Sequence, residues 1–177
     1  MDRKGLSETA SRVGMTWLAA LVTGLPILAL LLIPQLMRSR AGSEQLLGIG
    51  TALLLVLVAG AVAVAPIISA RAAPLADYWT PATALRTTAV LWRSRRAASI
   101  LSLGGFVAIY AVAQLIGLGV AELLPYVSDN PAFVEGGVES RWVIHYPEYV
   151  VQAVVIYLVV SFAVAWYGDR LRTLAVG

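Results

Sequence analysis

Four polar side chains within or beside long apolar stretches are the residues best placed to do chemistry. They are three amides and one acid: Gln35, Gln114, Glu122 and Gln152. If these groups converge, they form a shallow polar pocket that opens to one side of a membrane and hydrogen-bonds a solute. The alternative is that each amide bonds to a neighbouring helix, an interaction worth about 0.6 to 2 kcal/mol. The alternative is simpler, because it requires only that buried polar groups satisfy one another.

Charged residues are absent from the middle of every long apolar stretch. A charge at the centre of a membrane costs about 2.5 to 3.5 kcal/mol on insertion scales, so one retained there would have indicated a functional site. The sequence therefore disfavours a proton-coupled pump and an intramembrane protease.

His145 is the only histidine, and it lies among acidic residues. With Glu148, Glu139 or Asp129 it could form a metal site or a pH-sensitive contact. A solvated loop histidine is the simpler interpretation, because no metal-ligand spacing surrounds it. The chain also has no cysteine and no phosphate-binding glycine loop. We expect no catalytic residues, no metal and no cofactor. The hypothesis ranked last is therefore a membrane enzyme that works at the outer surface with Glu135, Glu139, His145 or Glu148.

The stretch 71–96 carries five of the thirteen basic residues. This stretch could contact anionic lipid or a cytosolic partner, with Trp79 and Trp92 at headgroup depth. The residues of this candidate site are Arg86, Trp92, Arg93, Arg95 and Arg96. The alternative is that the arginines set the orientation of the chain in the membrane and have no other role.

Thr80 followed by Pro81 predicts that a helix starts within this stretch, with a hydroxyl N-cap and proline at the first helical position. Three apolar residues share one side of this helix: Leu85, Ala89 and Trp92. Arg96 falls on the same side and Leu91 lies away from it, so the predicted interfacial helix is only partly amphipathic.

The elements that position these residues are predicted to be transmembrane helices. Mean hydropathy is +0.81 and only 13% of residues are charged, whereas about 25% is usual in soluble domains. Four stretches are long enough to cross a bilayer: residues 13–37, 45–70, 97–121 and 149–167. We predict an all-α integral membrane protein, one domain over residues 1–177, whose four spans form two hairpins. The fourth span is close to the minimum length.

The first apolar stretch follows basic residues, as the core of a cleaved signal peptide would, but it is too long for one. Pro26 and Pro34 lie within it and remove backbone donors, so we expect a bend at Pro26. A hinge is the functional interpretation. The alternative is that membrane helices commonly tolerate proline.

Small residues recur in the second and third spans, where they allow helix backbones to approach closely. In the second span they cluster near its middle: Ala59, Gly60, Ala61, Ala63 and Ala65. In the third they recur at every fourth position: Gly104 with Ala108, and Ala113 with Gly117 and Ala121. We predict that both spans pack against other helices through these residues.

The distribution of charge predicts the orientation. All basic residues except Arg38, Arg40 and Arg141 fall in the two terminal segments and the stretch 71–96, whereas the loop 122–148 is acidic. Lysine and arginine are enriched in cytoplasmic segments. We therefore expect a multi-pass protein of the cell membrane, with both termini and the basic connector 71–96 in the cytoplasm and the acidic loop 122–148 outside.

These features predict a polytopic membrane protein that acts by helix–helix association, as an accessory or assembly subunit. Its expected partners are the lipid bilayer and other membrane subunits or further copies of itself, and we expect no nucleic acid. The alternative is a small oligomeric transporter or channel that uses the outward-facing polar pocket. No resemblance to a known family supports either hypothesis.

Overall fold

The computed structural model describes residues 3–33, 44–75, 78–121, 123 and 146–176, and these residues form an all-helical fold. The helices are α1 (Arg3–Leu31), α3 (Glu44–Ala72), α4 (Ala84–Ser94), α5 (Arg96–Ala121) and α7 (Tyr146–Val176). All but α4 are long and apolar enough to cross a membrane, with candidate spans at Ser7–Leu31, Gly48–Ala72, Arg96–Val120 and Tyr149–Val176. The predicted all-α fold class is thereby confirmed.

The last helix is longer than its sequence indicated. We predicted that the fourth span ends at Tyr167, because Gly168 and a charged segment follow, but α7 continues to Val176. The charged side chains within this extension have partners. Asp169 pairs with Arg12, and Arg170 lies over the ring of Trp166.

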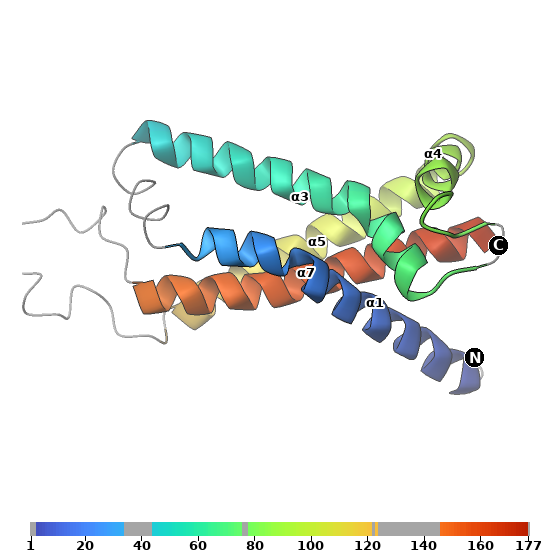
Figure 1. The fold of residues 1–177 in the computed structure, drawn as a ribbon, viewed down its shortest axis with the longest axis horizontal. Coiled ribbons are helices and arrows are strands. Elements are labelled where there is room, and N and C mark those ends of the chain that lie inside the picture. The colour runs from blue at the N-terminus through green and yellow to red at the C-terminus, as the bar shows by residue number, and fades with distance from the viewer. Residues whose placement is uncertain (1–2, 34–43, 76–77, 122, 124–145, 177) are drawn as a thin grey trace, which may run out of the picture.

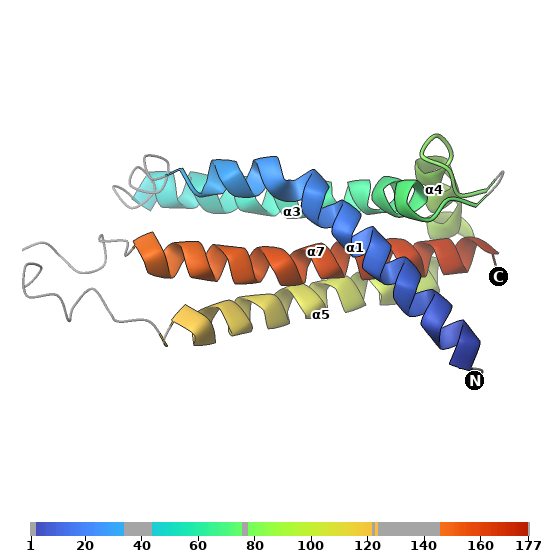
Figure 2. The same ribbon diagram turned by 60° about the horizontal axis from the view of Figure 1, so that its bottom comes forward.

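Helix α7 lies at the centre of the bundle. It contacts α1, α3, α5 and α4, and Figure 2 shows it running between α3 and α5. Both views show α1 crossing α7 obliquely and changing direction along its length (Figures 1 and 2). Pro26 lies inside α1, which ends at Leu31 and so stops short of the predicted boundary at residue 37. Pro34 lies outside the described residues.

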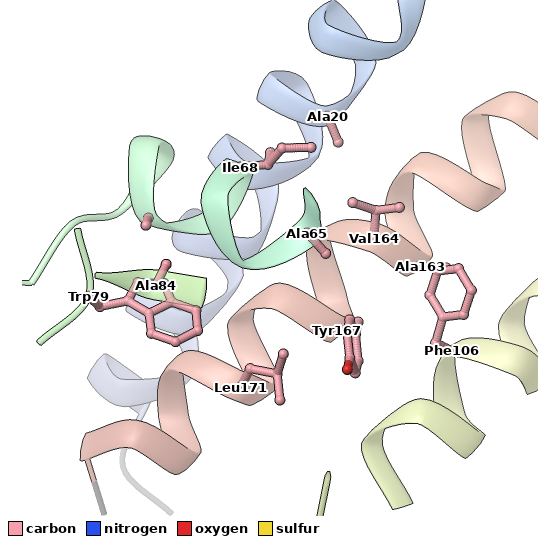
Figure 3. Close-up of a cluster of buried hydrophobic side chains, with 11 residues drawn as sticks. Ala20, Ala65, Ile68, Trp79, Ala84, Phe106, Ala163, Val164, Tyr167 and Leu171 are labelled. Atoms are coloured by element: carbon pink, nitrogen blue, oxygen red, sulfur yellow. The ribbon is translucent and has the colours of Figure 1, made fainter. Parts of the chain in front are cut away.

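Large aromatic side chains fill the core near the C-terminal part of α7 (Figure 3). Trp79, Phe106 and Tyr167 are fully buried, and the rings of the last two meet edge to face, with centroids 6.0 Å apart. Burying large aromatic surfaces contributes strongly to stability wherever water has access. The core therefore concentrates at one end of the bundle, where the connector joins α3 to α5.

Small residues of α5 divide between a buried face and an exposed one. Ala113 and Gly117 are buried, and a Cβ at Gly117 would lie 2.7 Å from Cγ1 of Ile156 in α7. Gly104 and Ala108 are exposed, so the prediction that they form part of the same packing seam is wrong. Their neighbour Gly105 makes the contact instead, because the Trp166 ring occupies the space that a side chain there would need.

Candidate functional site at the connector end

The connector end of the bundle, formed by residues 68–75, 78–96 and 163–176, holds all five residues of the predicted basic site. Trp79 ties the connector to α3, because its indole N–H donates a hydrogen bond of 3.3 Å to Oγ of Ser69. Leu75 and Trp79 also exchange two backbone hydrogen bonds, of 3.0 and 3.2 Å. A tryptophan whose ring is buried and whose N–H has a partner is a strong anchor. The connector is therefore fixed against the bundle at this point.

The start of α4 differs from the prediction. The helix begins at Ala84, three residues after Pro81, because paired threonines hold a turn before it. The backbone N–H of Thr80 donates to Oγ1 of Thr83 at 3.0 Å, and the N–H of Thr83 donates back to Oγ1 of Thr80 at 3.3 Å. Reciprocal bonds of this kind satisfy backbone donors that would otherwise lack partners at a helix start.

Helix α4 lies across the bundle instead of along it, and Figure 1 shows it almost end-on while the long helices run horizontally. Its buried residues are Ala84 and Leu91. Leu85 and Ala89, on the side that we predicted to be apolar, are exposed. Only Trp92 of that set turns inward, where its side chain interacts with the Tyr167 hydroxyl. The helix thus packs through the face that carries Leu91.

The four predicted site arginines are all exposed: Arg86, Arg93, Arg95 and Arg96. Within the described parts of the chain, the one ion pair is between Arg12 and Asp169, so no described carboxylate neutralises these arginines. Exposed apolar side chains lie beside them, because Leu85 and Val90 are 51% and 55% exposed. The outer face of α4 is therefore both basic and apolar.

A charged cluster at the same end joins three segments that are distant in sequence. Nε of Arg12 lies 3.1 Å from Oδ1 of Asp169, and the two side chains are 30% and 8% exposed. Arg172 is close enough to interact electrostatically with both residues, and its Nε donates a 3.0 Å hydrogen bond to the carbonyl of Ala73. That carbonyl lies just beyond the C-terminus of α3, where a cation is favourable. The cluster joins α1, α7 and the connector, a role that the sequence did not indicate.

The predicted polar pocket lies toward the opposite end and is only half described. Gln114 and Gln152 are half-buried on α5 and α7, two helices that pack together, and Cγ of Gln152 lies 3.3 Å from the Cβ position of Gly117. Gln35 and Glu122 lie outside the described residues. The convergence of all four side chains stays a prediction.

The predicted histidine site also lies outside the description, because His145, Asp129, Glu135 and Glu139 are not among the described residues and Glu148 is described only as part of α7. Over the residues that the structure does place, no group of three or more potential metal ligands comes together.

Comparison of the chain with known protein families, with curated proteins and with solved structures finds no significant match.

Proposed function

We propose that this polytopic membrane protein is an accessory or assembly subunit that associates with another membrane protein through α3. The observation that supports the proposal is that the first two thirds of this helix contain no buried residue among those whose exposure is described. Every residue of α3 that is buried lies between Ala65 and Ala70, among those whose exposure is described. By contrast, α5 has buried residues from Ser99 to Gly117, and thus follows α7 along most of its length.

The exposed face of α3 carries small residues at helical spacing. Gly48, Ala52, Ala59 and Ala63 are all exposed, and a Cβ added at Gly48 would meet nothing within 4 Å. Figure 1 shows the first half of α3 diverging from α1 and α7. Small residues spaced four apart allow the backbone of a second helix to approach closely in a membrane. This face is suited to a helix of another subunit.

Leucine substitutions on this face test the association. We expect Ala59→Leu with Ala63→Leu to reduce co-purification of partner subunits from mild detergent about tenfold, because overpacking costs about 1 to 3 kcal/mol and about 1.4 kcal/mol corresponds to a factor of ten. Ala108→Leu with Ala111→Leu, an equivalent change at exposed positions of α5, is the control and should leave the yield of partners unchanged. If the unmodified protein is recovered only as an isolated monomer, the proposal is wrong.

The orientation is proposed with the connector end in the cytoplasm of a cell membrane. The support is the set of exposed arginines at that end, because positively charged segments are retained on the cytoplasmic side.

The alternative function, a small oligomeric transporter or channel, has support only from the half-buried amides of Gln114 and Gln152.

Cysteine labelling tests the orientation, because the chain has no cysteine of its own. An impermeant maleimide applied to intact cells should modify Ser128→Cys and leave Ser94→Cys unmodified. Ser94 is exposed, so its protection cannot arise from burial, and Ser94→Cys should react once the membrane is permeabilised. Labelling of Ser94→Cys in intact cells would contradict the proposed orientation.

A further inference from the structure

We propose that the outer face of α4 is a binding surface for the phosphate groups of anionic phospholipids. This inference is separate from the proposed association through α3. The surface is defined by Leu85, Arg86, Ala89, Val90 and Arg93, all of which are exposed. The buried residues of α4 are instead Ala84 and Leu91, and Trp92 interacts with Tyr167 of α7.

The order of side chains around α4 places the two arginines between apolar residues. At 100° per residue, Arg86 and Arg93 lie within about 20° of each other, with Leu85 and Ala89 on one side of them and Val90 on the other. The two arginines are seven residues apart, which separates them by about 10 Å along the helix. An interfacial helix requires this combination, because its apolar side chains enter the acyl boundary while the guanidinium groups reach the phosphates.

The position of α4 also fits a lipid headgroup layer. Helices α3, α5 and α7 run lengthwise through the bundle, and α4 lies across them at the connector end (Figures 1 and 2). The first residue of the candidate span in α5 is Arg96, two residues after α4 ends. The helix therefore lies at the depth where a span meets the headgroups.

The charge balance favours an anionic lipid over a zwitterionic one. Arg86 and Arg93 have no ion pair among the described residues, and the carboxylate of Asp169 at the same end of the bundle is already paired with Arg12. A guanidinium group binds phosphate through two parallel hydrogen bonds. An acidic protein could also pair with the arginines. Pairing of charges alone, however, would not account for the exposed apolar side chains of Leu85 and Val90 beside them.

A lipid titration of the full-length protein tests the proposal. A fluorophore that responds to polarity is attached through Ser94→Cys, and the protein in detergent micelles is titrated with phosphatidylglycerol or with phosphatidylcholine. We expect a saturable response to phosphatidylglycerol alone. Arg86→Gln with Arg93→Gln should raise the half-saturating lipid fraction about 30-fold, since each arginine near an anionic surface contributes about a 5-fold preference.

The matched control removes two other exposed arginines from the same end of the bundle. Arg71→Gln with Arg170→Gln lowers the net charge equally but leaves α4 intact, and it should change the half-saturating fraction by less than about 2-fold. Arg86→Lys with Arg93→Lys retains the charges and should keep most of the binding, which guards against a folding defect in the glutamine variant.

Three results would overturn the proposal. They are equal responses to the two lipids, equal losses in the α4 variant and its control, and a response that requires an added acidic protein. The first result means that headgroup charge is not recognised. The second means that only the total charge of the connector end matters, and the third assigns the surface to a protein partner.

Discussion

Gly168→Leu is expected to separate α3 from α7 and to lower the free energy of unfolding by about 3 kcal/mol, at the upper end of the usual cost of overpacking. A Cβ at this position would lie 2.8 Å from the carbonyl oxygen of Ala65 and 2.8 Å from Cβ of Ser69. The first atom belongs to the backbone, so the whole helix must move. Ser69 also accepts the hydrogen bond from Trp79, so the displacement should loosen the connector.

The unfolding midpoint in mixed detergent micelles, titrated with dodecyl sulfate, measures this effect. Gly104→Leu is the matched control, because Gly104 is exposed and a Cβ added there would meet nothing within 4 Å. We expect the control to unfold at the same detergent fraction as the unmodified protein. Equal midpoints for the two leucine variants would show that α3 and α7 do not approach each other through Gly168.

Asp169→Asn is expected to lower the free energy of unfolding by about 2 kcal/mol. Removing one partner of a buried ion pair costs about 3 to 5 kcal/mol, and the effect is smaller here because the Arg12 side chain is 30% exposed and stays partly hydrated. Asparagine preserves the shape of the side chain, so the loss reports the missing charge. The same detergent titration gives the stability.

The coupling between the two residues can be measured with a double-mutant cycle. Arg12→Gln with Asp169→Asn should cost less than the sum of the two single changes, because neither charge is then left alone. Glu8→Gln removes an exposed carboxylate from α1, the helix that carries Arg12, and should leave stability unchanged. Additive losses would indicate that the observed contact between Arg12 and Asp169 contributes nothing to stability.

Hydropathy was sufficient to predict four spans, because a stretch of about 20 apolar residues has few alternatives to a transmembrane helix. It did not indicate that the helix α7 continues beyond Tyr167, since Asp169 and Arg172 resemble a solvated tail until their partners are known. Arg12 is 157 positions from Asp169 in the sequence. No local pattern could reveal that pair.

The candidate site was predicted in part. The exposure of Arg86 and Arg93 agrees with the expected surface, but the packed face of α4 was not predicted, because Leu91 appeared isolated on the helical wheel. The expectation that Trp79 lies at headgroup depth is wrong, because its ring is fully buried in the bundle, and its role as an anchor was missed. A single tryptophan in a connector gives no periodic signal, and only the structure shows that Ser69 receives its N–H.

The central position of α7 affects the order in which the protein can assemble during synthesis. Helices α1 and α5 make their main contacts with α7, and α3 also contacts it at Gly168. Because α7 follows them in the chain, the ribosome releases three hydrophobic segments before the segment that unites them. Until translation reaches α7, the insertion machinery and the surrounding lipid must shield those earlier segments.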